Sequence, residues 1–231
     1  MGKILFTLET ENGQTNYIAG TVEKVREGTG AATGRVRNVL VNLSVYENNT
    51  FVHKQIDIAL WNDSKNPDDK RKQLATRAQT INLSKGDFML FICGNITEKG
   101  VSASNIPQLA TRAFGFEFNM RRTVEVDTVK GLFNNEILCG IVRRMNLAID
   151  RPYITVPINT FKDGEKGSDW VTIFLKDSDE NIKKYVQEGT PIACVTSEIR
   201  ENIGENGYKS LTCSMFQYVL GQARKTKKAS A

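Results

Sequence analysis

The residues Ile137-Leu138-Cys139-Gly140-Ile141-Val142 open the stretch that decides the fold, which ends at Leu220. The patterning of apolar residues in this stretch predicts strands over 137–142, 153–161, 170–175, 191–199 and 209–218. A short helix is predicted between the third and fourth of these strands, from Ser178 to Val186. Three strands, a helix and a closing hairpin, in this order, are typical of the OB-fold, a Greek-key barrel that commonly binds oligonucleotides.

Two sequence segments within this stretch also resemble a known protein family. Trp170 leads a strand of alternating apolar residues, and the helix runs into Lys183-Lys184-Tyr185-Val186-Gln187-Glu188-Gly189-Thr190-Pro191-Ile192. Together they resemble the bacterial single-stranded DNA-binding protein family, over most of the second half of the chain. The resemblance implies an OB-fold that coats single-stranded DNA. Family members usually carry one such domain and an acidic tail tip, whereas this chain ends in basic and small residues, which favours a phage, plasmid or otherwise divergent member.

The first half of the chain repeats the pattern in outline. Residues 16–22 resemble 136–142, and residues 84–88 correspond to 187–191. Strands are predicted over 39–46, 55–61, 88–96 and 111–118, and the insertion over 62–78 becomes helical only after Pro67. The sequence therefore predicts an all-β protein with short helices, built as two tandem five-stranded OB-fold Greek-key barrels. Its predicted parts are domain 1 over 1–120, domain 2 over 134–221 and a basic flexible tail over 222–231.

Composition limits the function classes. The net charge of +5 and the pI near 9.0 suit a polyanionic partner. No eighteen apolar residues occur together and the N-terminal apolar run is too short for a signal peptide, so we expect a cytoplasmic protein, in the host cytoplasm if viral, with no membrane partner. The four cysteines lie in predicted apolar strands and are interpreted as reduced core thiols. His53 is the only histidine, so we expect no catalytic set, no metal site and no cofactor.

Side-chain parity selects the candidate binding residues. Successive residues of a strand face opposite sides, so the aromatic residues that alternate with the apolar core positions should face outward, where each can stack on a base. The predicted stacking residues are Tyr46, Phe51 and Trp61 in the first domain and Tyr153, Phe161, Trp170 and Phe174 in the second. The predicted phosphate contacts are Arg35, Arg37 and Lys54 in the first domain and Arg143, Arg144, Arg151, Lys162 and Lys166 in the second. Phe114, Phe116 and Phe118 share one parity and are assigned to the core or to the domain interface.

These patterns predict a non-enzymatic protein that coats and protects single-stranded DNA, with little sequence preference, during replication, recombination or strand transfer. Two alternatives stay open: a structural or assembly protein, such as a virion component, that uses its OB-folds to dock proteins, and an RNA-binding chaperone. The resemblance implies that four OB-folds often work together, which two copies of this chain would supply as a homodimer paired through exposed fourth and fifth strands. Partner replication or recombination proteins are not identified by the sequence.

Overall fold

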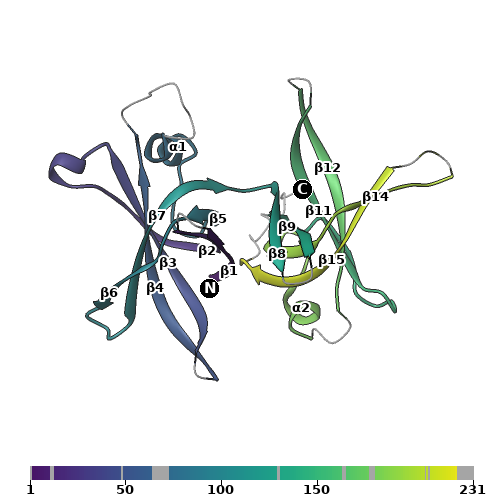
Figure 1. The fold of residues 1–231 in the computed structure, drawn as a ribbon, viewed down its shortest axis with the longest axis horizontal. Coiled ribbons are helices and arrows are strands. Elements are labelled where there is room, and N and C mark those ends of the chain that lie inside the picture. The colour runs from purple at the N-terminus through teal and green to yellow at the C-terminus, as the bar shows by residue number, and fades with distance from the viewer. Residues whose placement is uncertain are drawn as a thin grey trace, which may run out of the picture. The chain divides into compact units, whose positions relative to one another are not determined.

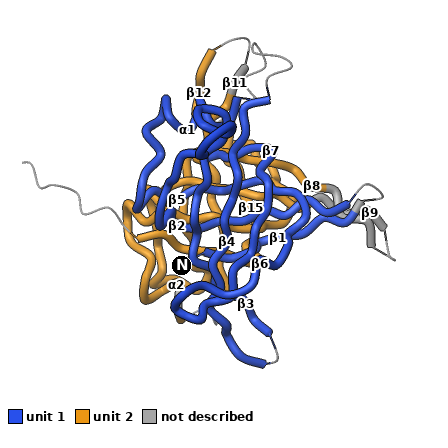
Figure 2. The backbone as a smooth tube through the Cα atoms, turned by 90° about the vertical axis from the view of Figure 1, so that its left-hand side faces the viewer, with its two compact units in different colours: residues 1–117 blue, residues 118–231 orange. Residues whose placement is uncertain are grey.

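The chain divides into two compact units in a computed structural model that describes residues 2–10, 13–47, 49–63, 73–128, 131–162, 165–176, 180–205, 207 and 209–222. Unit 1 comprises Met1–Glu117 and unit 2 comprises Phe118–Ala231 (Figure 2). Strands make up most of both units, and the described helices are short, so the all-β class is confirmed (Figure 1). Neither α-helix described below has the length or the apolar run that a membrane crossing needs.

Unit 1 is a barrel with a short helix. Its described elements are β1 (Lys3–Thr10), β2 (Gly13–Glu27), a 3-10 turn (Gly30–Ala32), β3 (Val36–Glu47), β4 (Thr50–Trp61), α1 (Leu74–Thr80), β5 (Phe88–Cys93), β6 (Thr97–Val101) and β7 (Pro107–Glu117). The strand order is β1-β2-β3-β4-β7-β5, and β5 pairs again with β2, which closes the barrel. Only the β4–β7 pair among these neighbours is parallel. This closure, with the helix between the third and fourth barrel strands, is that of an OB-fold.

Unit 2 repeats this topology. Its described elements are β8 (Met120–Thr128), β9 (Gly131–Ile141), β10 (Arg144–Asn146), β11 (Tyr153–Lys162), β12 (Glu165–Phe174), α2 (Glu180–Tyr185), β13 (Pro191–Ser197), β14 (Arg200–Ile203) and β15 (Lys209–Leu220). The order is β10-β11-β12-β15-β13-β9-β8, with β12 and β15 parallel. Because β10 follows β9 directly, the two act as one bent first strand, and the Arg143 N–H donates to the Thr155 carbonyl where they meet (2.9 Å).

The two barrels match residue by residue at the bend of their first strand. A Cβ atom on Gly20 would lie 2.7 Å from Cγ1 of Val41, and one on Gly140 would lie 2.6 Å from Cγ1 of Val156. Only glycine fits so close an approach, so both barrels need it at this point. Two residues later, the N–H of Val22 bonds to the Asp87 carbonyl as that of Val142 bonds to Thr190. The duplication that the sequence predicts is confirmed.

Strands occupy the region that the sequence analysis placed between the two domains. Residues 119–135, interpreted as the region between domains, instead form β8 and the start of β9, so unit 2 begins at Phe118 rather than at residue 134. Val124 and Val126 alternate with charged residues there, which is the sequence pattern of a half-exposed strand. The fourth and fifth barrel strands are not edges either, because each pairs on both sides. Among the described strands, edge positions belong to β1, β6, β8, β10 and β14.

The helices and the core agree with the sequence pattern. α2 lies within the predicted range, while α1 begins at Leu74; Pro67 and the other residues of 64–72 lie outside the described residues, as does the predicted basic tail beyond Gln222. All four cysteines are free and buried, as predicted. The unit 2 core gathers inward residues of every barrel strand, among them Ile154, Val156, Val171 and Ile173, each at most 1% exposed.

Candidate nucleic-acid interface

The outer face of unit 2 is built by β11, β12 and β15. Because Ile154, Val156 and Ile158 point into the core, the residues between them on β11 point outward. Register pairs these outward residues across the strands: Tyr153 with Phe174, Thr155 with Thr172 and Pro157 with Trp170. The parallel partner β15 extends the face, with Thr212 beside Thr172 and Ser214 beside Phe174. The structure thus brings Tyr153, Trp170 and Phe174 onto one surface.

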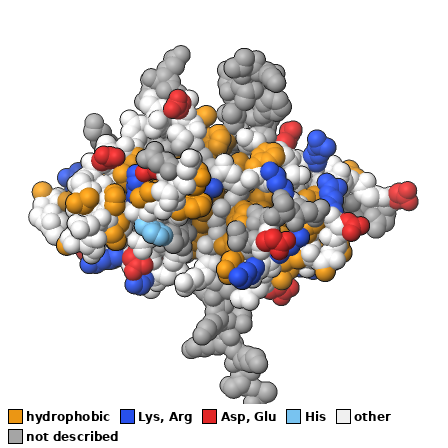
Figure 3. Space-filling view, turned by 90° about the horizontal axis from the view of Figure 1, so that it is seen from below, with side chains coloured by type: hydrophobic (Ala, Val, Ile, Leu, Met, Phe, Trp, Pro, Cys, Tyr) orange, Lys and Arg blue, Asp and Glu red, His pale blue; other side chains and the backbone are white. Residues whose placement is uncertain are grey.

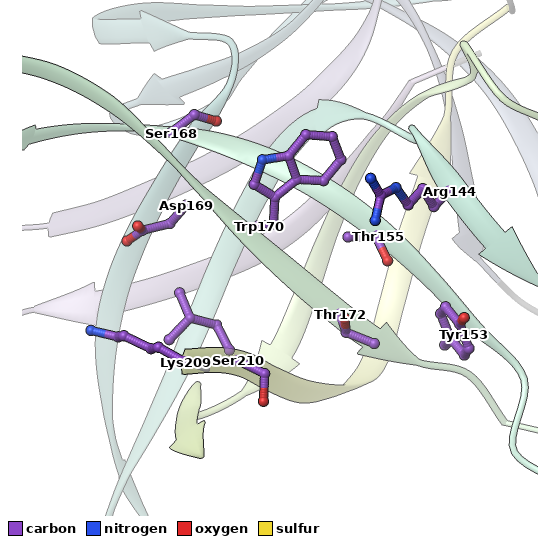
Figure 4. A pocket seen from close by; sticks show the side chains of 10 residues that line it. Arg144, Tyr153, Thr155, Ser168, Asp169, Trp170, Thr172, Lys209 and Ser210 are labelled. Atoms are coloured by element: carbon purple, nitrogen blue, oxygen red, sulfur yellow. The ribbon is translucent and has the colours of Figure 1, made fainter. Parts of the chain in front are cut away.

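Trp170 stands at the centre of a groove on this face. The groove has a volume of about 590 Å³, within the roughly 300–1,000 Å³ range of small-ligand pockets, and Trp170 is 44% exposed. The Arg144 guanidinium lies 5.1 Å from the centroid of the indole ring. Figure 4 shows Arg144 on one side of the indole and Ser168 and Asp169 on the other. This arrangement offers a ring for stacking and a cation for a neighbouring phosphate.

A second hollow follows on the same face. Phe174 lies in it with the Arg151 guanidinium 4.0 Å from its ring centroid, and the Tyr153 ring meets Phe174 edge-on at 6.4 Å. Phe216 of β15 also lines this hollow and is 51% exposed. Sequence reasoning missed Phe216, although a signal exists: Leu211, Cys213 and Met215 are buried, so the parity of β15 directs residue 216 outward.

The other basic residues predicted in unit 2 have varied positions. Arg143 is exposed next to Arg144, and Lys166 is exposed opposite Phe161 in the β11–β12 hairpin. The side chains of Phe161 and Lys162 lie outside the described residues. Lys209, which sequence reasoning missed, lines the Trp170 groove.

Lys209 also has an acidic partner, because its Nζ lies 2.5 Å from Oε2 of Glu201. On the face drawn in Figure 3, basic side chains lie among acidic ones rather than in a single basic field. The modest net charge is therefore not gathered on that face.

In unit 1 the matching surface has different chemistry. Val41 pairs with Ile56 as Val156 pairs with Val171, which aligns β4 with β12. The positions of Trp170, Thr172 and Phe174 are then occupied by Gln55, Asp57 and Ala59. Unit 1 thus has no aromatic residue at these three positions, and it has a carboxylate in the middle.

The basic residues predicted for unit 1 are largely engaged with carboxylates. Arg37 is paired with Glu27 and Lys54 with Glu47. Asp57 itself is paired with Arg26 (Nη2 to Oδ2, 2.7 Å). Arg35 is exposed, and its carbonyl accepts a hydrogen bond from the N–H of Asn62. These ion pairs lower the positive charge that the face could offer to phosphates.

The aromatic residues predicted for unit 1 do not gather in one place. Tyr46 and Phe51 stack edge-on at the tip of the β3–β4 hairpin, with centroids 5.0 Å apart and exposures of 61% and 69%. Trp61 lies ten residues further along β4, about 33 Å away at the usual rise of a strand. There the Arg112 guanidinium lies 5.9 Å from its ring centroid.

The three phenylalanines assigned to the core or to the domain interface differ in burial. Phe116 is fully buried, as predicted, and Phe118 is half-buried, but Phe114 is 58% exposed. The register of β5 against β7 slips between Ile92 and Cys93, so a bulge switches the parity of β7 between residues 114 and 116. The assignment of Phe114 to the core is therefore wrong.

A buried carboxylate and three buried thiols lie within the barrels. Glu136 is 1% exposed and accepts hydrogen bonds from Arg121 (2.8 Å) and Thr123 (3.1 Å), and the Glu136 hydrogen bond raises the pKa of Arg121. Burial raises the pKa of Cys93 and Cys194, and raises that of Cys213 to about 11. These three thiols stay protonated at neutral pH and are poor nucleophiles. Within the described residues no group of three or more His, Cys, Asp or Glu side chains gathers as a metal would require.

The chain matches no protein-family model and no curated protein. Its function must therefore be argued from the chemistry of the two outer faces.

Proposed function

We propose that this protein binds single-stranded nucleic acid, with DNA as the expected polymer, on the outer face of β11, β12 and β15 in unit 2. One observation carries the proposal: Trp170 stands 44% exposed in a groove of the barrel face, with the Arg144 guanidinium against its ring. An exposed tryptophan next to a cation can stack on a base and attract the adjoining phosphate. The protein would act without catalysis, coating and protecting the strand during replication, recombination or transfer.

The chemistry of the face favours a single strand and weak sequence preference. Stacking uses the flat face of a base, which a duplex hides and every base possesses. Thr155 and Thr172 pair across the strands beside Trp170, and their short side chains leave room for a base above them. The outward residues nearest Trp170 in the β11–β12 pair, Pro157, Thr155 and Thr172, carry no amide and no charge. Readout of base edges by side chains would therefore be limited.

Protein docking is the second candidate, and one observation favours it in unit 1. Tyr46 and Phe51 form an edge-to-face aromatic pair at a hairpin tip, and each residue is more than half exposed. Exposed aromatic residues of this kind also serve as anchors in protein interfaces. Under this alternative the outward aromatic residues contact a protein, and oligonucleotides would not bind.

A fluorescence titration separates the candidates. Trp61→Phe leaves Trp170 as the only tryptophan in the chain, so its emission reports on the unit 2 groove. We expect oligo-dT to quench this emission and duplex DNA of the same length to bind far more weakly. For each phosphate contact, the logarithm of the binding constant should fall by about 0.7 for every tenfold rise in salt concentration. Oligo-U in parallel tests the RNA alternative, while unchanged emission and a flat salt response would favour docking.

A further inference from the structure

We infer that the strand path proposed above continues past Trp170 to a second base-stacking subsite, formed by Phe216 and Phe174. This inference rests on the proposed function and adds a distinct site to it. Phe216 is 51% exposed on β15, and it lines a hollow together with Phe174 and Arg151. The ligand at this subsite would be one base of a single strand, with its phosphate facing the arginines.

The subsite belongs to the same surface as the Trp170 groove. Trp170, Thr172 and Phe174 are alternate residues of β12, so all three point to the outer side of the barrel. Thr212 of β15 lies beside Thr172 in the parallel register, and it lines the second hollow. The two hollows are therefore consecutive parts of one track over β12 and β15.

The separation of the two platforms places non-adjacent nucleotides on them. Trp170 and Phe174 are four residues apart, about 13 Å along a strand. Successive bases stacked as in duplex DNA rise only about 3.4 Å, so neighbouring stacked bases cannot occupy both platforms. A base that stacks on either ring must give up a stacking neighbour in the strand, and this gives the track a preference for flexible single strands.

The charges around Phe216 suit a phosphate backbone. Arg151 is held with its guanidinium 4.0 Å from the Phe174 ring centroid, and exposed Arg200 lines the same hollow. Glu198 is the carboxylate among the lining residues, so the two arginines leave a positive balance. Asn202, held by a hydrogen bond to Thr212 Oγ1 (3.0 Å), adds a polar group at the rim.

Unit 1 keeps an exposed phenylalanine at the matching position. The register of β5 with β7 slips after Ile92 and that of β13 with β15 slips after Val195, so the two bulges coincide. Counting from these bulges aligns Phe114 with Phe216, and both are more than half exposed. Because both phenylalanine rings are largely exposed, neither ring is needed to fill the core of its barrel. Trp61, with Arg112 beside it, ends the neighbouring strand in unit 1, two residues beyond the position that aligns with Phe174.

Affinity measurements on Phe216 variants test the subsite. In the Trp61→Phe background, Phe216→Ala should weaken binding to an oligo-dT of about 16 nucleotides by roughly 5- to 150-fold, the effect of losing one stacked base. The maximal quenching of Trp170 at saturation should persist, because the first platform is intact. Phe216→Leu, which keeps the apolar bulk, should lose affinity as well. Tyr185→Ala is the matched control, since Tyr185 is 60% exposed on α2 and lines neither hollow.

Cross-linking supplies a direct readout. Irradiation of an oligo-dT that carries bromodeoxyuridine should join the strand to a peptide that contains Phe216. If Phe216→Ala and Phe216→Leu bind like the parent while Trp170→Ala is weakened, the second subsite is overturned and the proposed function stands. If the parent protein neither binds nor shows quenching, the proposed function itself fails.

Discussion

Unit 1 and unit 2 have the same barrel but different outer faces. Both bend their first strand at a glycine packed against a valine, and both close through a parallel pair of third and fifth barrel strands. On the third barrel strand, the outward residues are Gln55, Asp57 and Ala59 in unit 1 and Trp170, Thr172 and Phe174 in unit 2. The barrel therefore supplies a surface, and the side chains at these positions decide what that surface can bind.

The buried layer beneath the faces differs too. Asn16 and Glu136 occupy the same position of the first barrel strand, four residues before Gly20 and Gly140, and both are buried. The Asn16 amide donates to the Gly94 carbonyl, whereas the Glu136 carboxylate depends on Arg121 and Thr123. Unit 1 thus satisfies this position with neutral groups and unit 2 satisfies it with an ion pair.

The largest expected effect follows from that ion pair. Arg121→Ala should destabilise unit 2 by about 3 kcal/mol, the lower end of the range for removing one partner of a buried pair, because Arg121 is itself partly exposed. In unit 1, Thr7→Ala removes a hydrogen bond to Asn16 Oδ1 and should cost only about 1 kcal/mol. Urea unfolding measures both losses of stability. In variants that keep a single tryptophan, Trp61 emission reports on unit 1 and Trp170 emission reports on unit 2. Glu136→Gln added to Arg121→Ala should recover stability, and equal small losses in the two units would contradict the account.

The next effect compares the faces at one matched position. Trp170→Ala should weaken oligo-dT binding by about 1–3 kcal/mol, because a stacking platform is removed while the core is untouched. Gln55→Ala, at the same position of unit 1, should change binding by less than about 0.5 kcal/mol. Fluorescence anisotropy of a labelled oligo-dT gives both values. A loss at Gln55 as large as that at Trp170 would mean that the two faces bind alike.

The smallest effect concerns the charges of unit 1. Asp57→Asn frees Arg26 from its ion pair, and it should strengthen oligo-dT binding by at most about 1 kcal/mol. The slope of the logarithm of the binding constant against the logarithm of salt should become steeper by about 0.7, the value for one added phosphate contact. Thr172→Asp introduces the same carboxylate into unit 2 and should weaken binding. Salt titrations of both variants provide the test. An unchanged slope for Asp57→Asn would mean that the freed Arg26 of unit 1 makes no additional contact with a phosphate of the strand.

The alternation of apolar and polar residues along single strands made much of the fold and of the candidate site predictable from the sequence. The period of two identified the barrel strands and placed Ile154 and Val156 inside and Tyr153 and Trp170 outside. Glycine spacing identified the repeated bend and the repeated turn at Gly86 and Gly189, both of which have positive φ.

Features that depend on pairing between distant strands were not predictable. The Arg26–Asp57 pair joins residues 31 positions apart, and it exists only because register brings their strands together. The exposure of Phe114 depends on a bulge whose cause lies on the neighbouring strand β5. The strand β8 was missed because Arg121, Arg122, Glu125 and Asp127 outnumber its apolar residues in the local sequence.

One measurement tests the central claim most directly, because each unit contains one tryptophan. The two indole Nε1–H resonances can be followed by two-dimensional NMR while oligo-dT is added to the whole chain. We predict that the Trp170 resonance shifts strongly and saturates with binding, while the Trp61 resonance shifts less. A strong shift of Trp61 with an unmoved Trp170 would contradict the assignment of the strand to the outer face of unit 2.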